Sequence, residues 1–179
     1  MILAGVRGPV IAGAVLIASI LAGACSAGAG APPTDKAPQT PSGLPVPRYV
    51  VLKFDAVNAR SGPSDDHRLL WVYHTKGLPV QVVAETRDWR RICDPDGGLS
   101  WVHRRTTDGR RSVMRAGADP APIRKSPRAD APVVAYLASR ALASLDHCAG
   151  GWCKVKVGAA SGWAAVDGLW GVAETPQCR

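Results

Sequence analysis

The chain contains the hexapeptide Asn58-Ala59-Arg60-Ser61-Gly62-Pro63, and a similar hexapeptide, Pro122-Ile123-Arg124-Lys125-Ser126-Pro127, follows 64 positions later. Two tryptophan landmarks repeat in the same order, with offsets of 63 and 62 residues. These landmarks are Trp89 with Trp152 and Trp101 with Trp163. Ordered landmarks with a nearly constant offset are typical of an internal repeat. The sequence therefore predicts two copies of one small module.

The segments between these landmarks carry a β-strand signal. Short apolar or alternating runs are separated by turn residues such as Gly62-Pro63 and Gly97-Gly98, which is typical of a small all-β barrel or sandwich. Residues 135–145 are rich in Ala and Leu and would also suit a helix, but their register with the first copy favours strands. The expected strands are 50–52, 69–73, 78–83 and 89–93 in the first copy, and 133–137, 141–145 and 152–157 in the second.

These runs define the domain organisation. The first module is expected at residues 49–111 and the second at residues 120–173, with a connector at 112–119 and a C-terminal tail at 174–179. Each module has roughly 60 residues, a size at which the hydrophobic core is marginal. Packing of one module on the other is therefore expected to add stability.

The N-terminus has the features of an export signal. Arg7 is the only charged residue before Asp35, and an apolar run at residues 10–21 leads into small residues. Residues 1–29 are therefore predicted to be a secretory signal peptide, with a retained anchor as the alternative. Residues 30–48, which contain six prolines, are predicted to form an extended linker.

The signal ends near a cysteine. The segment Leu21-Ala22-Gly23-Ala24-Cys25 resembles a bacterial lipoprotein cleavage box, which would make Cys25 a lipidated residue. The alternative is cleavage after Ala27 or Ala29, which gives a soluble protein. A lipidated protein would be anchored to a membrane without spanning it. Ser26 would then favour the outer membrane, by resemblance to Gram-negative lipoproteins.

The other four of the five cysteines suit an oxidising compartment. Cys148 and Cys153 flank the turn signal Gly150-Gly151, so a disulfide is expected across a hairpin. Cys93 with Cys178 is only the pair that then remains. Four cysteines allow three pairings, and the sequence alone leaves the connectivity open.

The ordered landmarks resemble the bacterial SH3-like domain. The resemblance implies tandem five- or six-stranded barrels with a non-catalytic role, similar to modules that hold envelope proteins on peptidoglycan peptides or glycan. Ser126 replaces Gly62, and Ser139-Arg140 replaces Lys76-Gly77, so the second copy is expected to be degenerate. The residues that carry the resemblance are Asn58, Arg60, Gly62, Pro63, Gly77, Trp89, Trp101 and Val102, then Arg124, Pro127, Trp152, Gly162 and Trp163, and finally the closing Leu169-Trp170-Gly171.

Four residues are candidates for a ligand groove. Trp71 and Tyr73 have no aromatic counterpart at Ala135 and are candidates for its aromatic lining, while Arg60 could bind a carboxylate and Asp65 is a loop acid. The interpretation preferred for Arg60 and its counterpart Arg124 is a contact that fixes the loop after the first hexapeptide strand. The four recurring tryptophans, Trp89, Trp101, Trp152 and Trp163, are expected to fill the barrels.

The chain is basic, with 22 Lys and Arg against 14 Asp and Glu and a formal charge of +8. Such a charge would attract anionic lipid, anionic polysaccharide or acidic peptide, although a merely solvated basic surface is the simpler explanation. Export argues against a nucleic-acid partner.

The sequence thus predicts an exported, periplasmic or outer-membrane-anchored protein that binds peptidoglycan or an envelope protein without catalysis or cofactor. One alternative is a structural interaction protein that never touches the wall. Another is a thiol hydrolase using Cys93 with His103, and a zinc site at His147 with Cys148 and Cys153 is disfavoured by the expected disulfide. The oligomeric state is left open.

Overall fold

The computed structural model describes residues 40–178, and in this part every regular element apart from one short 3-10 helix is a β-strand. The all-β prediction is therefore confirmed. The expected signal peptide, Cys25 and most of the linker lie outside the described residues. No helix within residues 40–178 is long and apolar enough to span a membrane.

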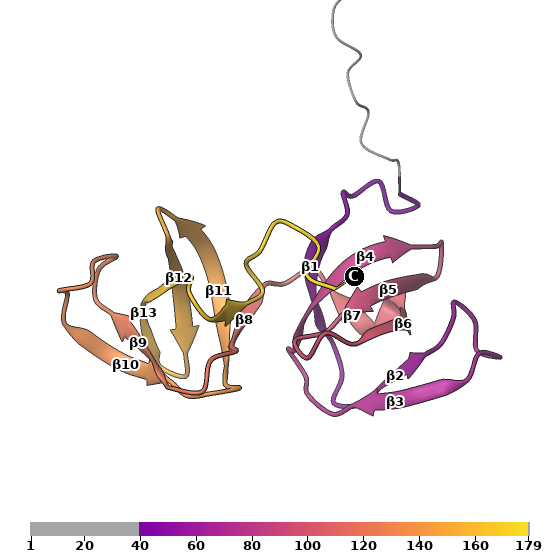
Figure 1. Ribbon diagram of the computed structural model, residues 1–179, viewed down its shortest axis with the longest axis horizontal. Helices are drawn as coiled ribbons and strands as arrows, with labels where there is room; N and C mark the ends of the chain where they lie inside the picture. Colours follow the sequence, from indigo (N-terminus) through magenta and orange to yellow (C-terminus); the bar gives the residue numbers. More distant parts are fainter. Residues whose placement is uncertain (1–39, 179) are drawn as a thin grey trace, which may run out of the picture. The chain divides into compact units, whose positions relative to one another are not determined.

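The strands form two seven-stranded sheets with the same topology (Figure 1). The order is β3-β2-β6-β5-β4-β1-β7 in the first sheet and β10-β9-β13-β12-β11-β8-β14 in the second. Each strand of the first sheet thus has a counterpart seven strands later, which confirms the internal repeat.

The first sheet consists of β1 (Arg48–Leu52), β2 (Val57–Arg60), β3 (Leu69–Tyr73), β4 (Pro79–Glu85), β5 (Trp89–Cys93), β6 (Leu99–His103) and β7 (Thr107–Asp108). The 3-10 helix η1 (Arg104–Thr106) joins β6 to β7. The second sheet consists of β8 (Ser112–Arg115), β9 (Ala121–Arg124), β10 (Val133–Leu137), β11 (Leu142–Ala149), β12 (Trp152–Val157), β13 (Ala160–Ala165) and β14 (Leu169–Trp170). Residues 142–145 are strand, as register with the first copy predicts.

Apolar side chains that alternate with more exposed ones along the strands form one hydrophobic core in each sheet. In the first, Val80 and Val82 of β4 pack with Ile92 of β5, and all three are fully buried. In the core of the second sheet, Ile123, Leu137 and Val155 are buried and pack with smaller side chains. Each such side chain contributes roughly 1.5–3 kcal/mol on burial.

The segment expected to be a connector contains a strand. β8 occupies residues 112–115 and pairs with β11, so it is the counterpart of β1. Met114 of β8 and Trp170 of β14 also pack on the first core, and the Trp170 indole N–H donates to the carbonyl of Pro79 at 2.7 Å. The second module thus begins before residue 120, and its strands complete the first core.

Part of the predicted linker is docked on the first sheet. Val46 packs against the first core, and the backbone N–H of Ser42 donates to Glu85 at 3.0 Å. Arg48 donates to the same carboxylate, whose side chain is only 2% exposed. The extended linker therefore ends before residue 42.

The expected disulfide Cys148–Cys153 is present, and the pair that remained, Cys93 and Cys178, forms a second one. Cys148–Cys153 joins β11 and β12 across their hairpin, and Cys93–Cys178 ties the end of β5 to the C-terminal segment. This segment also satisfies the buried amide of Gln81, which donates to the carbonyl of Thr175 and accepts from the N–H of Gln177, each at 2.9 Å. The predicted tail is thus held against β4 and β5.

Candidate binding site

A cleft opens in the first module where two neighbouring strands part. β2 pairs with β6 at a single position, Arg60 with Trp101, and beyond it the strands separate toward Asn58 and His103. The resulting cleft has a volume of about 360 Å³. Its lining residues are Ala56, Asn58, Arg60, Asp65, Trp89, His103 and Thr106.

A second cleft occupies the equivalent place in the second module. β9 pairs with β13 only at Arg124 with Trp163, and the cleft beyond has a volume of about 330 Å³. Its lining residues are Arg115, Pro120, Ala121, Pro122, Arg124, Ala129, Trp152, Ala165 and Asp167.

The strand registers establish that the two clefts are equivalent. Trp89 lies opposite His103 in the first sheet, and Trp152 lies opposite Ala165 in the second. The repeat thus places an arginine and a tryptophan at the same positions of both clefts. A concave site formed by the same framework in both copies is the strongest candidate for ligand binding in the described chain.

The chemistry of the two clefts differs. The first carries Asn58, Asp65 and His103, and the corresponding positions of the second are Pro122, Ala129 and Ala165. The lining of the first cleft therefore carries more polar side chains than that of the second, whose charged residues are Arg115, Arg124 and Asp167. The degeneracy expected for the second copy affects its lining as well as its turns.

Arg60 and Arg124 fix loops, as the preferred sequence interpretation holds. The Arg60 guanidinium donates to the carbonyl of His67 at 2.9 Å, and that of Arg124 donates to the carbonyl of Ala131 at 2.7 Å. Each acceptor lies seven residues after its arginine. Arg60 also lies 3.5 Å from the carboxylate of Asp65, whose side chain is largely exposed.

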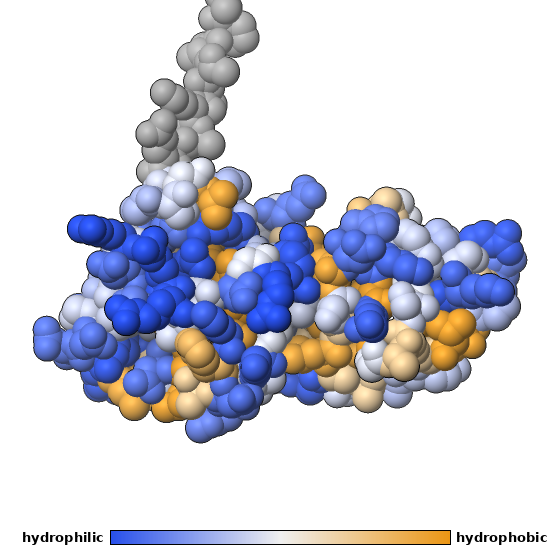
Figure 2. Space-filling view, turned by 180° about the vertical axis from the view of Figure 1, so that it is seen from behind, coloured by the Kyte–Doolittle hydropathy of each residue, from blue (hydrophilic) through white to orange (hydrophobic). Residues whose placement is uncertain are grey.

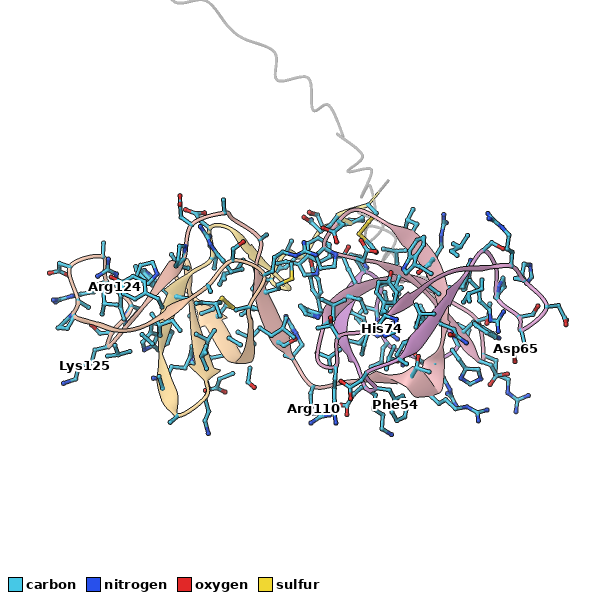
Figure 3. The ribbon with its side chains drawn as sticks, turned by 90° about the horizontal axis from the view of Figure 1, so that it is seen from below. Phe54, Asp65, His74, Arg110, Arg124 and Lys125 are labelled. Atoms are coloured by element: carbon cyan, nitrogen blue, oxygen red, sulfur yellow. A yellow bond between two sulfur atoms is a disulfide. The ribbon has the colours of Figure 1, made fainter. Side chains whose placement is uncertain are left out.

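The four predicted groove residues do not come together. Arg60 and Asp65 line the first cleft, but Trp71 and Tyr73 lie opposite Ala59 and Val57, which point to the buried face of the hairpin. Asp65 projects from the loop between β2 and β3 (Figure 3). The predicted groove is thus divided between two faces of the sheet.

Tyr73 is held in place by buried polar groups. Its hydroxyl donates to the carboxylate of Asp94 at 2.9 Å, and burial raises its pKa well above the usual range. Trp71 packs edge-on against Tyr73, with ring centroids 6.0 Å apart, and is 36% exposed. Trp71 therefore remains accessible, while Tyr73 supports it.

Only one of the four recurring tryptophans is buried as expected. Trp89 is 8% exposed, whereas Trp101, Trp152 and Trp163 are only partly buried, and neither core cluster of residues 40–178 contains any of the four. The expectation of core tryptophans is therefore corrected for these three, which cross-strand pairing places on the more exposed face of the sheet. Their repeated positions were the signal that could have located the clefts.

His103 combines a structural contact with its place in the cleft. Its Nδ1 accepts from the backbone N–H of Arg105 at 3.2 Å and so caps η1. Its ring packs against that of Trp89, with centroids 5.3 Å apart. The cleft residues that the sequence did not single out for a groove are Ala56, Asn58, Trp89, His103 and Thr106.

The cysteines required by the thiol-hydrolase and zinc-site alternatives are engaged in the two disulfides. Cys93 is fully buried and bonded to Cys178, so it holds no free thiol beside His103. Cys148 and Cys153 are likewise bonded to each other. Within residues 40–178 there is no group of three or more side chains arranged to hold a metal ion.

The face shown in Figure 2 is mostly hydrophilic, with apolar side chains in scattered areas. Several of the exposed apolar residues belong to β3 and β10, which are equivalent edge strands. They are Leu69, Trp71, Val133, Val134 and Tyr136.

A family model described as "Bacterial SH3 domain" matches residues 53–109 and 117–171. A search of curated proteins gave no match. Among solved structures, the chain is similar to NlpC2 and NlpC1 from Trichomonas vaginalis, at 12% and 14% identity, with a TM-score of 0.32 in each case. These similarities cover 69% of this chain but only 48% and 45% of the two proteins, so the chain spans less than half of their length.

Proposed function

Because the chain belongs to the bacterial SH3 domain family and carries the domain twice, we propose that it is a non-catalytic binding protein of the cell envelope whose ligand is peptidoglycan. Bacterial SH3 domains commonly bind peptidoglycan or envelope partners. The proposal places the protein outside the cytoplasm, in the periplasm or anchored to the outer membrane through Cys25.

The observation that carries this proposal is the pair of equivalent clefts. Both are formed by the same divergence of two strands, next to the single pairs Arg60–Trp101 and Arg124–Trp163. Two weak sites on one chain gain affinity together when the ligand is a polymer, because the second binding event becomes intramolecular. A polymeric wall suits such a tandem arrangement.

The proposal is tested by cosedimentation with purified sacculi. Ala56→Trp and Ala129→Trp introduce a large ring at an exposed position in each cleft, and the double variant is expected to remain in the supernatant. Ala159→Trp makes the same change at the exposed turn between β12 and β13 and serves as the matched control. Wild-type protein that fails to sediment with sacculi at any salt concentration would overturn the proposal.

A second candidate function is docking to an envelope protein. The exposed apolar side chains of β3 and β10 favour it, because an edge strand offers unpaired backbone groups to an incoming strand. Trp71→Ala separates the two candidates. Loss of sacculus binding in this variant would show that the edge strand β3 itself binds peptidoglycan. Unchanged sacculus binding would leave the exposed Trp71 as a contact for a protein partner.

A further inference from the structure

A cationic row borders each cleft on the outer face of its sheet. In the first module, Trp101 lies directly opposite Arg60 on one side and Arg91 on the other. Side chains that are directly opposite in antiparallel strands point to the same face. The first row is therefore arginine, tryptophan, arginine across β2, β6 and β5.

The second module repeats this row. Trp163 lies opposite Arg124 and also opposite Lys154, whose ammonium group stands 5.5 Å from the centre of the indole ring. The position of Arg91 is taken by Lys154, so the cation is kept although the residue changes. Arg124 and its neighbour Lys125 are marked at the end of β9 in Figure 3.

The rows and the clefts share a residue. Arg60 and Arg124 each belong both to a row and to the lining of a cleft. Trp101 and Trp163 are partly exposed, and Arg91 is exposed. A ligand held by Arg60 or Arg124 at the edge of a cleft therefore lies beside an indole ring that has a second cation on its other side.

We propose that the two cationic rows bind a carboxylated glycan strand, with a sugar ring on Trp101 or Trp163 and its carboxylates on the flanking cations. Guanidinium groups match carboxylates with two parallel hydrogen bonds. The electron-rich face of indole attracts the C–H groups of a sugar ring. An acidic peptide would satisfy the cations but offers no flat ring for the tryptophan.

This inference rests on the proposed function and narrows the wall component to glycan whose muramyl carboxylates carry no stem peptide, because a stem peptide is joined to that carboxylate as an amide. Repetition of the row favours a linear polymer over a small anion, since two rows on one chain bind one strand with increased avidity. The overall positive charge of the chain adds attraction at long range.

The test measures binding of the purified protein to three defined hexamers by calorimetry. Hexagalacturonate supplies sugar rings with carboxylates, chitohexaose supplies neutral rings, and hexaglutamate supplies carboxylates without rings. Binding to hexagalacturonate that is at least about tenfold tighter than to the other two is expected. Equal binding to hexaglutamate would overturn the glycan assignment, and absent binding to hexagalacturonate would overturn the proposal.

Two pairs of variants with equal charge test the rows themselves. Arg91→Gln with Lys154→Gln is expected to weaken hexagalacturonate binding about tenfold through the lost charge-assisted hydrogen bonds. Arg87→Gln with Arg128→Gln removes two exposed cations outside the rows and is expected to change binding less than about twofold. Equal losses of hexagalacturonate affinity in both double variants would show that binding depends only on general charge attraction, and would overturn the proposal.

Substitutions at the two row tryptophans provide an independent test of the proposal. Trp101→Phe with Trp163→Phe keeps a ring in each row and retains binding, whereas leucine at both positions abolishes it. If the leucine variants do not fold, the charge-matched pairs still decide the question. Sacculus binding without hexagalacturonate binding would refute this inference and leave the proposed function standing. The reverse result would refute the proposed wall binding and would leave a carboxylated glycan other than peptidoglycan as the ligand of the rows.

Discussion

At the residue scale, Arg140 shows how the second copy departs from the first. Gly77 has φ of +82° in the turn before β4, and Arg140 adopts φ of +62° before β11. This region costs a side chain about 1–2 kcal/mol relative to glycine. Arg140 donates to both carboxylate oxygens of Asp96, at 2.6 and 2.9 Å, which partly compensates.

Two variants separate the backbone cost from the ion pair. Arg140→Gly and Arg140→Ala both remove the contact with Asp96, but only glycine relieves the left-handed backbone. We expect the glycine variant to be more stable than the alanine variant by about 1 kcal/mol in denaturant unfolding. Equal stabilities would show that this turn relaxes without cost.

Glu85 makes the unfolding free energy of the first module depend on pH in the acidic range. Burial alone would raise its pKa, but hydrogen bonds from Ser42 and Arg48 outweigh that effect and lower the pKa to about 2. Because the folded-state pKa is below the unfolded value of 4.5, the stabilisation is present above pH 4.5 and is lost as the pH falls toward 2.

This linkage predicts a difference between wild type and Glu85→Gln. Over the interval from pH 5 to pH 2, wild type should lose on the order of 3 kcal/mol more unfolding free energy than the variant does. Urea unfolding at successive pH values measures this. Parallel pH profiles would mean that Glu85 is not the responsible group.

At the scale of elements, the sequence predicted seven of the fourteen strands of residues 40–178, because short apolar runs recur in register with turns between them. β8 was assigned to a connector because its residues Ser112–Arg115 follow a cluster of arginines and form too short a run to stand out. Its place in the sheet comes from pairing with β11, which is a tertiary contact. The clefts were not predicted for the same reason, because no local sequence pattern indicates where β2 separates from β6.

The role of β8 is testable at Met114. This side chain is 2% exposed and belongs to the first core, so Met114→Ala should cost about 2–5 kcal/mol of unfolding free energy. Arg110→Ala, at an exposed position shortly before β8, should change it by less than about 0.5 kcal/mol. A true connector would tolerate both substitutions equally in thermal or chemical denaturation.

At the scale of the whole molecule, the two disulfides close loops of very different length. Cys93–Cys178 spans 85 residues and Cys148–Cys153 spans 5. In the chain-entropy account, these correspond to about 4.5 and about 2 kcal/mol of stabilisation. Cys93 also lies beside Gln81, whose buried amide depends on the C-terminal segment.

Paired serine substitutions test this difference. Replacing Cys93 and Cys178 should lower the unfolding free energy by about 2.5 kcal/mol more than replacing Cys148 and Cys153. Chemical denaturation under identical non-reducing conditions provides the comparison. A larger loss from the short hairpin disulfide would contradict the account of the C-terminal segment as a clamp on the first sheet.

The two clefts are the centre of this account, and the six indole N–H signals of the protein report on them directly. The decisive measurement is a two-dimensional NMR titration with soluble peptidoglycan fragments, following each assigned indole resonance. We expect the signals of Trp89 and Trp152, which line the clefts, to shift together with ligand while that of Trp71 stays in place. A shift confined to Trp71, or no shift at fragment concentrations that compete with sacculi, would contradict it.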